Sequence, residues 1–366
     1  MKNKNTLTTL LLLAGILVLI LIVVLIATTG FEKKDTVTVG FIMTGSTTEH
    51  GWNQLHYEGI LEACEELDAT LIVKEEVKEY TGQCRQAIHE LAEEEVDMII
   101  LSSYGYAPEV LDVVKEYPEI AFYSESFDHT ASNMKSYFAR MYQARYLAGI
   151  IAGMKTDTNN IGYVAAMANN EVNRGINAFT LGVRRVNPDA QVIVGFSNSW
   201  DDAAREKELA QDLINERKVD VLTYHQNQPN VVQVAEEYDI ASIGYHEAPS
   251  EVSDNFLTAA VFHWNLTYRE VLQDYMRGTS DAINTYWVGI DQGAIGLSEF
   301  SPLVSSDIIK EVELATQEMI NGFDVFSGEI YDKDGILRCS EGETISDEKL
   351  LKNFAWYVEG VELYEE

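Results

Sequence analysis

Short apolar runs alternate with amphipathic segments along most of the chain. The run VTVGFIM at residues 37–43 is typical of a buried strand, and residues 52–67 carry apolar or small side chains at helical spacing. The series continues with predicted strands and helices at residues 70–77, 84–95, 96–103, 109–117 and 120–126. This strand–helix alternation predicts a parallel sheet covered by helices.

The same alternation restarts in the second part of the chain. After a helix predicted at residues 142–155, further strands and helices are predicted at residues 160–166, 172–186, 190–198, 202–217, 219–225 and 241–246. Two similar halves, with no low-complexity sequence between them, indicate an α/β protein made of two lobes.

The first 30 residues follow a different pattern. Lys2 and Lys4 precede an uncharged segment whose centre, LLLLAGILVLILIVVLIA at residues 10–27, is apolar throughout. A signal-peptide core has about 7–15 such residues, whereas a membrane-spanning helix needs about 20. We expect an N-terminal membrane anchor at residues 1–30 and a linker at 31–36, with the remainder outside the cytoplasm. A cleaved signal peptide is the alternative.

The composition narrows the possible partners. The 366 residues include 26 Lys+Arg and 59 Asp+Glu, so the formal net charge is −33. Nucleic acid and anionic membrane surfaces would repel such a protein, and neither is an expected partner. The sequence contains no phosphate-binding loop, dinucleotide fingerprint, nucleophile elbow or zinc-protease motif. We therefore expect no catalysis, no cofactor and no metal.

The segments that follow the predicted strands carry the candidate binding chemistry, because open parallel sheets bind ligands beyond the carboxyl ends of their strands. They are rich in aromatic, hydroxyl and amide side chains, with a few carboxylates and imidazoles. They read TGSTTEHGW, SSYGY, SES, AMANNE, SNSW, YHQNQ and YHEAP. This mixture suits a flat, neutral ligand with a polar edge. For any single residue, a role in a turn, a helix cap or the core is equally open.

Several of these segments resemble one known family. VGFIMTGSTTEHGWNQLHYEGI, FARMYQARYLAGIIAG and NIGYVAAMANNEVNRGINAFTLGVRRVNPDAQV occur in an order similar to that of the basic membrane protein family. The tail DKDGILRCSEGETISDEKLLKNFAWYVEGV is similar to the family's C-terminal hairpin and final helix. Members of that family are substrate-binding proteins of ABC transporters for purines and nucleosides.

The resemblance implies the type I periplasmic-binding-protein fold, in which two Rossmann-like lobes are joined by three crossovers and close over a ligand. On this interpretation, residues 37–140 and about 256–286 form lobe one, and residues 141–255 and about 287–325 form lobe two. Residues 326–366 are then expected to form a C-terminal hairpin and helix.

The resemblance also implies site residues. Trp52 matches the aromatic residue that stacks on the purine, and Asn53 and His56 follow it in a pattern similar to the adenine-type branch. Glu125 is the nearest carboxylate to the Asp that often ends the family's fourth strand. Where nucleoside-binding members have Gly-Val-Asp to hold the ribose, this chain has Gly244, Tyr245 and His246, which favours a free base or a nucleoside held differently. Further candidates at strand ends are Tyr104, Arg140, Tyr142, Trp200 and Gln226.

The implied function is capture of a purine nucleobase or nucleoside by closure of the two lobes, with an ABC permease and ATPase as partners. The alternative is a membrane-anchored ectodomain of the same fold that senses a ligand for regulation.

Overall fold

The computed structural model describes residues 36–48, 51–127, 129–249, 252–280 and 284–365. The anchor expected at residues 1–30 lies outside these residues. Within the described part of the chain, no helix has both the length and the apolar character needed to cross a membrane.

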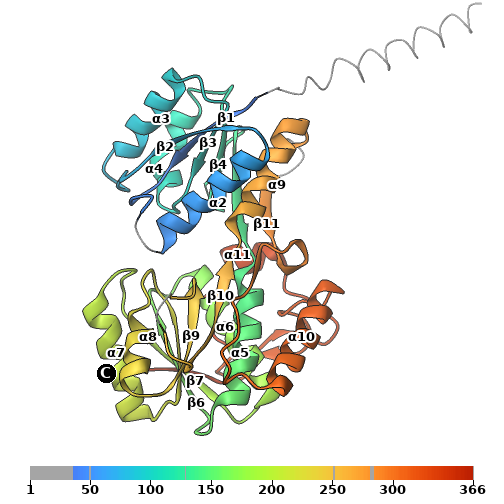
Figure 1. Cartoon of the computed structure of the whole chain (residues 1–366). Helices are drawn as coiled ribbons and strands as arrows, with labels where there is room; N and C mark the ends of the chain where they lie inside the picture. Colours follow the sequence, from blue (N-terminus) through green and yellow to red (C-terminus); the bar gives the residue numbers. More distant parts are fainter. Residues whose placement is uncertain (1–35, 49–50, 128, 250–251, 281–283, 366) are drawn as a thin grey trace, which may run out of the picture.

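Lobe one is built on a parallel sheet (Figure 1). Its strands are β1 (Thr38–Ile42), β2 (Thr70–Lys74), β3 (Met98–Leu101), β4 (Ala121–Ser124), β5 (Met134–Ala139) and β11 (Thr285–Val288). They are arranged in the order β11-β5-β4-β3-β1-β2. All the pairings are parallel, so the carboxyl ends of the strands meet at one edge of the sheet.

Helices cover both faces of this sheet. They are α2 (Trp52–Glu66), α3 (Gln83–Glu93), α4 (Tyr106–Val114) and α9 (Trp264–Arg277). Successive strand residues point to opposite faces. Phe41 therefore packs in the core that α2 and α9 share, whereas its neighbour Ile42 packs in the core beneath α3 and α4. The buried strand predicted from VTVGFIM is thus apolar on both sides because both sides are covered.

Lobe two is built on a second sheet with the same kind of order. Its strands are β6 (Asn160–Ala165), β7 (Gln191–Phe196), β8 (Val221–His225), β9 (Ala241–His246), β10 (Phe256–Phe262), β12 (Ile295–Leu297) and β15 (Val361–Leu363). They are arranged as β12-β10-β9-β8-β6-β7-β15, and only the β10–β12 pairing is antiparallel among those described. Its helices are α5 (Met141–Lys155), α6 (Asn170–Val186), α7 (Ala203–Arg217), α8 (Asn230–Glu237) and α10 (Ser306–Ile320). The predicted α/β fold with two lobes and parallel sheets is confirmed.

Helices α5 and α6 touch backbone to backbone. A Cβ atom at Gly149 of α5 would lie 2.0 Å from the carbonyl oxygen of Phe179, and one at Gly182 of α6 would lie 2.0 Å from the carbonyl oxygen of Tyr146. Only glycine permits so close an approach. Since α5 begins directly after β5 of lobe one, this helix pair joins the core of lobe two to the first crossover.

The chain passes between the lobes near Arg140, His263 and Gly289. The crossing segments bind one another: the Arg140 amide donates to the carbonyl oxygen of Val288 (2.7 Å), and the His263 amide donates to that of Ala294 (2.8 Å). The return to lobe one comes later than the predicted residue 256, because β10 pairs with β9 in the second sheet. Conversely, β11 keeps the chain in lobe one to Val288.

The C-terminal segment runs back over lobe two. It contains the predicted hairpin, β13 (Ile330–Tyr331) with β14 (Leu337–Cys339), and a short helix α11 (Asp347–Lys352), before ending in β15. Two asparagines of α6 hold it in place: Nδ2 of Asn173 donates to the Phe354 carbonyl (3.0 Å), and Nδ2 of Asn177 donates to the Trp356 carbonyl (2.8 Å). The final strand was not anticipated from the sequence.

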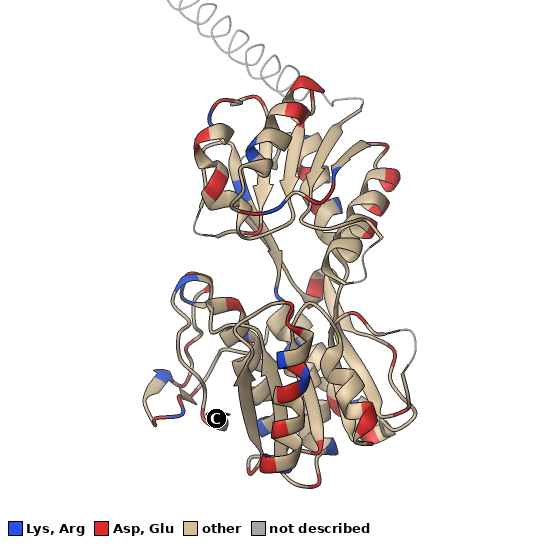
Figure 2. Cartoon of the chain, turned by 90° about the vertical axis from the view of Figure 1, so that its left-hand side faces the viewer, with Lys and Arg blue, Asp and Glu red and all other residues tan. Residues whose placement is uncertain are grey.

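Acidic side chains are spread along the helices of both lobes, and basic ones are fewer (Figure 2). The negative charge of the chain is therefore a property of both lobes.

Candidate ligand-binding site

The strand ends of the two lobes face and touch each other. Gly51, which precedes α2 in lobe one, has φ of +93°, and a Cβ atom there would lie 2.9 Å from the carbonyl oxygen of Asn227 and 3.5 Å from Cε1 of His246. Asn227 lies in the loop after β8, and His246 is the last residue of β9, so both are at strand ends of lobe two. The structure therefore has the lobes close together at the edge where parallel sheets bind ligands.

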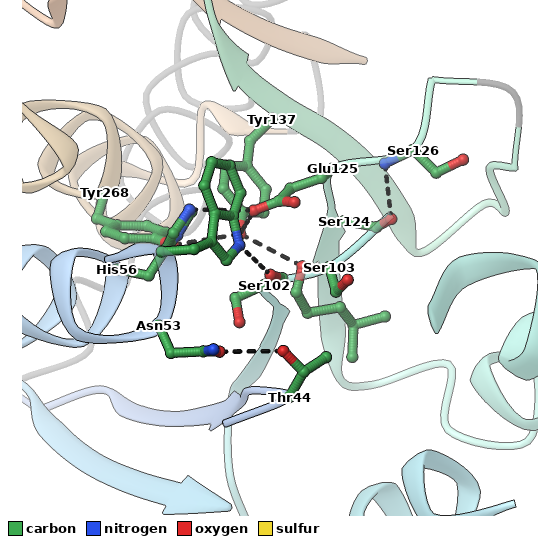
Figure 3. A network of polar contacts seen from close by, with 12 residues as sticks. Thr44, Asn53, His56, Ser102, Ser103, Ser124, Glu125, Ser126, Tyr137 and Tyr268 are labelled. Atoms are coloured by element: carbon green, nitrogen blue, oxygen red, sulfur yellow. Dashed lines mark hydrogen bonds and ion pairs between the residues drawn. The ribbon is translucent and has the colours of Figure 1, made fainter. Parts of the chain in front are cut away.

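In lobe one, four buried side chains form a connected polar network (Figure 3). Nδ1 of His56 on α2 bonds the hydroxyl of Tyr268 on α9, and that hydroxyl lies 3.2 Å from the hydroxyl of Tyr137 on β5. Tyr137 donates to Oε1 of Glu125 (3.2 Å), which lies 3.4 Å from Nε2 of His56. Each of the four side chains thus has a hydrogen-bond partner within the network, which lowers the cost of burying them, although Nε2 of His56 makes no hydrogen bond to a described residue.

Burial controls the protonation of this network. It raises the pKa of the Glu125 carboxyl well above its usual range, and the negative charge of Glu171 in lobe two acts in the same direction. Burial also lowers the pKa of His56 well below its usual value, with a smaller contribution from His246. The neutral forms of both side chains are favoured, so Glu125 is available as a hydrogen-bonding acid rather than as a fixed negative charge.

Trp52 lies at the start of α2, beside this network. Its indole Nε1 donates to the carbonyl oxygen of Ser102 at the end of β3 (3.1 Å). Its ring is 4.3 Å from the His56 ring and 5.6 Å from the Trp264 ring, centroid to centroid. Trp52 is only half-buried although its partners are fully buried. It is therefore the outermost ring of an aromatic group that lobe one presents at its strand ends.

Lobe two presents a second aromatic group at its own strand ends. The rings of His225 and Tyr245 lie 4.1 Å apart, and Trp200 lies 6.0 Å from His225. Phe262, at the end of β10, links the two groups, since its ring is 6.1 Å from Tyr245 and 6.0 Å from Trp52. A flat ligand held between the lobes would meet ring surfaces from both.

Charged groups lie beneath the aromatic group of lobe two. Arg145 is completely buried, its Nη2 donates to Oγ1 of Thr223 (3.1 Å), and its guanidinium lies 5.8 Å from the centre of the Tyr245 ring. Oε1 of Glu171 lies 3.6 Å from Nε2 of His225. Burial opposes ionisation of Glu171, but the neighbouring His225 ring and the positive charge of Arg174 outweigh it and lower the pKa of the carboxyl. Glu171 is thus the ionised carboxylate of the site.

Several polar groups of lobe two are buried with an atom that makes no hydrogen bond to a described residue, and two of them were predicted from the sequence. Oε1 of Gln226 and Nδ1 of His246 make no hydrogen bond to any described residue. His246 also has φ of +55°, a conformation that is uncommon outside glycine and asparagine and often marks functional positions. Because both atoms lie at strand ends of lobe two, where parallel sheets bind ligands, both are candidates for a hydrogen bond to a ligand.

The other sequence-predicted residues lie in structural contacts. Oδ1 of Asn53 accepts from Oγ1 of Thr44 and from the Gly45 amide (3.1 Å each), which shapes the loop after β1. Arg140 bonds the Trp287 carbonyl, the Tyr142 hydroxyl and Asp347, so Arg140 and Tyr142 belong to the crossover region. Tyr104 is about half exposed and lies outside both aromatic groups.

Sequence reasoning missed several residues of the candidate site, among them Glu171, His225, Tyr137 and Tyr268. The first two lie in strand-end segments that had been singled out, AMANNE and YHQNQ, but neither was chosen within them. Tyr137 and Tyr268 had no such signal, because β5 was not predicted and Tyr268 is on a helix that reaches the site from a distant part of the chain.

A metal site finds no support in the described residues, in which no three His, Cys, Asp or Glu side chains gather closely enough to hold an ion.

Known proteins resemble this chain over most of its length. The Bmp model, described as ABC transporter substrate-binding protein PnrA-like, matches residues 36–327. A purine-binding protein of Brucella abortus is 31% identical over 336 residues, which cover 90% of this chain and 94% of that protein. A Haloferax volcanii protein, named for a proposed role as an ABC transporter glucose-binding protein, is also 31% identical, over 91% of this chain and 82% of that protein.

Solved structures show the same fold at lower identity. A transcriptional activator of the comK gene from Bacillus halodurans has a TM-score of 0.68 at 22% identity, covering 78% of this chain and 98% of its own. A solute-binding protein of an ABC transporter system from Conexibacter woesei has a TM-score of 0.64 at 19% identity, covering 78% and 97%.

Proposed function

The chain belongs to the Bmp family of ABC transporter substrate-binding proteins, and we propose that its ligand is a purine nucleobase. Such proteins bind small solutes and deliver them to permease and ATPase subunits. The observation that carries the proposal is the pair of aromatic groups, one on each lobe, which Phe262 links. Hydrogen-bonding side chains lie beside both groups. Rings on both sides and polar atoms at the rim match a flat heterocycle.

A base without its sugar fits better than a nucleoside. At the position where the resemblance places a ribose-binding Asp, this chain has His246, preceded by Tyr245, whose ring packs against His225 and above Arg145. A carboxylate can accept hydrogen bonds from two ribose hydroxyls at once, whereas a neutral imidazole offers one acceptor nitrogen. We expect nucleosides to bind more weakly than the corresponding bases.

Closure of the two lobes provides the capture mechanism. Trp52 and Glu125 belong to lobe one, and Glu171, Gln226 and His246 to lobe two. A ligand between them contacts both lobes only in the closed arrangement, and its preference for that arrangement shifts the population towards it. The permease would then receive the closed, loaded form.

Calorimetry on the purified full-length chain tests the ligand class. Adenine, hypoxanthine, adenosine and D-glucose form the panel, because the two relatives at 31% identity are named for purine and for glucose. We expect the bases to bind and glucose not to bind. Binding of glucose without any purine would overturn the proposal.

A Trp52 variant tests the stacking. Trp52→Ala should weaken base binding by about 1–3 kcal/mol if the indole stacks on the ligand, since this is the range for base–aromatic stacking. Trp52→Phe retains an aromatic face and is the matched control, which should lose much less. An unchanged affinity in Trp52→Ala would assign the indole a purely structural role.

The N-terminal segment supports a location outside the cytoplasm. We propose that residues 1–30 anchor the chain in the membrane, since residues 10–27 are uniformly apolar and Lys2 and Lys4 precede them. Deleting residues 1–30 should release the protein from the membrane fraction without changing its affinity for the base. Persistent membrane association of the deleted chain would contradict this.

A regulatory role is the second candidate. The fold is compatible with both roles, because a transcriptional activator of 22% sequence identity shares it. Uptake of a radiolabelled base separates the two: transport requires that cells without this protein lose uptake, whereas regulation predicts unchanged uptake and altered transcription.

A further inference from the structure

The side chain of Arg140 is held against lobe one. Arg140 directly follows β5, and its Nε donates to the carbonyl oxygen of Trp287 on the neighbouring strand β11 (3.0 Å). Its guanidinium carbon lies 4.1 Å from the centre of the Trp287 ring, whose face attracts a cation. The indole is fixed in turn, because its Nε1 donates to the carbonyl oxygen of Ala139 in β5 (3.2 Å). Both strands belong to the sheet of lobe one, so the guanidinium is attached to that lobe.

The short helix α11 of the C-terminal segment is held against lobe two. The Leu350 carbonyl accepts from Nη1 of Arg174 (2.8 Å). The Leu351 carbonyl accepts from Nδ2 of Asn170 (3.1 Å), and Oδ1 of the same asparagine accepts from the Phe354 amide (2.9 Å). Asn170 and Arg174 both belong to α6, so α11 is attached to lobe two through its backbone.

Asp347, the first residue of α11, connects these two attachments. Its Oδ1 accepts from Nη1 of Arg140 (2.9 Å) and its Oδ2 accepts from Nη2 (2.5 Å), so the carboxylate and the guanidinium form a bidentate pair. Nη1 also donates to the hydroxyl of Tyr142, which lies only two residues along the chain, beside the crossover itself. A bidentate pair needs two parallel hydrogen bonds and therefore a fixed relative position of its two groups. A rotation of the lobes about the crossovers moves α11 relative to Trp287 and disturbs the pair.

We propose that Asp347 is a positioning residue that favours the closed arrangement of the lobes through Arg140. The pair is formed in this structure, in which Gly51 of lobe one touches Asn227 and His246 of lobe two. When the lobes separate the pair is lost, so its free energy contributes to closure. A solute that requires closure is then bound more tightly and released more slowly. The inference goes beyond the proposed ligand, because it concerns closure whatever solute is bound.

Distances between the lobes test this inference in the ligand-free, full-length chain. Thr48 and Ala204 are exposed residues that follow strands of lobe one and lobe two, and the three native cysteines are buried. Thr48→Cys and Ala204→Cys can therefore carry spin labels, and double electron–electron resonance measures the populations of short and long separations. We expect Asp347→Asn to lower the ratio of closed to open chains about fivefold. Identical distance distributions with and without this substitution would overturn the inference.

Glu359→Gln is the matched control. Oε1 of Glu359 lies 3.2 Å from Nη2 of Arg184 on α6, so this pair also joins the C-terminal segment to an arginine, but both partners belong to lobe two. The two carboxylate side chains are similarly exposed, at 53% for Asp347 and 63% for Glu359. Each substitution should lower the melting temperature by about 2 °C or less, since exposed ion pairs contribute little to stability. Only Asp347→Asn should change the label distances, and an equal change in both variants would contradict the inference.

Calorimetry and stopped-flow kinetics with adenine extend the test to binding. Asp347→Asn should bind adenine about fivefold more weakly, through faster dissociation rather than slower association. Asp347→Glu retains the carboxylate, and its affinity should lie closer to that of the parent chain. An unchanged dissociation rate in Asp347→Asn would contradict the role in closure. A parent chain that does not bind adenine would overturn the proposed purine function alone, because the label distances test closure without a ligand.

Discussion

The polar groups at the strand ends of lobe one bond mainly to one another, whereas those of lobe two bond mainly to nearby backbone and serine groups. His56, Tyr268, Tyr137 and Glu125 form a connected network inside lobe one, although Nε2 of His56 makes no hydrogen bond to a described residue. Gln226 and His246 of lobe two each use one atom within the protein and leave the other buried without a described partner. The first arrangement holds four side chains together beside Trp52, and the second leaves hydrogen-bonding atoms at two strand ends that a ligand could use.

This difference suggests that the two lobes contribute to ligand binding in different ways. In lobe one, buried hydrogen bonds hold the side chains of the network in place. In lobe two, we propose that Gln226 and His246 contribute to recognition of the ligand. Changes in the lobe-one network should therefore act mainly on stability, and changes at the strand ends of lobe two mainly on affinity and pH dependence.

The largest expected effect is a loss of stability in lobe two. In Gly149→Ala the new Cβ would lie 2.0 Å from a backbone oxygen of α6, which cannot move without displacing the helix. We expect lobe two to lose about 3–5 kcal/mol in its free energy of unfolding. Urea unfolding followed by fluorescence and circular dichroism measures the loss.

Gly195→Ala is the control for this change. Its new Cβ would lie 3.1 Å from a side-chain atom of Leu209, which can rotate away, so we expect a loss of about 1 kcal/mol or less. Two resolved transitions in Gly149→Ala, with the later one unchanged from the parent, would show that lobe one is stable independently. Equal losses in the two variants would contradict the helix-contact explanation.

The second prediction concerns the loss of folding stability at acidic pH. The folded-state pKa of His246 is about 4, below its ordinary 6.5, so the unfolded chain binds more protons between these values. Its contribution to stability is complete above pH 6.5 and is lost as the pH falls towards 4, by about 3 kcal/mol in all. His246→Asn, in which asparagine tolerates the left-handed backbone, should show a correspondingly shallower fall in unfolding free energy from pH 7 to 4.5.

His89→Asn is the matched control, because His89 is an exposed histidine of lobe one. It should reproduce the parent's pH profile. If His246→Asn also matched the parent, the buried, neutral histidine at the strand end of β9 would not be a source of the acid sensitivity.

The smallest expected effect tests the hydrogen-bond network of lobe one. Tyr268→Phe removes the hydroxyl that bonds Nδ1 of His56 and lies 3.2 Å from Tyr137, and should cost about 2 kcal/mol because a buried polar atom loses its partner. Base affinity, measured by calorimetry, should change less than threefold. Tyr275→Phe on the same helix is the control, since that hydroxyl has only a long 3.4 Å contact to the Asp97 carbonyl. An affinity loss larger than the stability loss would mean that the network itself contacts the ligand.

The sequence was most informative where structure depends on neighbours in the chain. Alternating apolar runs predicted the strands at residues 37–43 and 160–166 and the helices that follow them, because burial on both faces requires continuous apolar strands. The strand-end rule also selected the segments that hold Trp52, Glu125, Gln226 and His246. It could not separate these from Arg140 and Tyr142, whose strand-end positions turned out to serve the crossover.

The sequence by itself determined the two α/β lobes, because they follow from local periodicity, and it predicted the segments for the binding residues from the direction of parallel strands. Only the tertiary structure decided that β10 stays in lobe two, that His56 pairs with Tyr268 and Glu125, and that Gln226 and His246 keep an acceptor free. A hydrogen bond depends on distances of about 3 Å between residues that are far apart in the chain. Residue type and spacing carry no information about those distances. The difference between the hydrogen bonding of the two lobes therefore follows only from the tertiary structure.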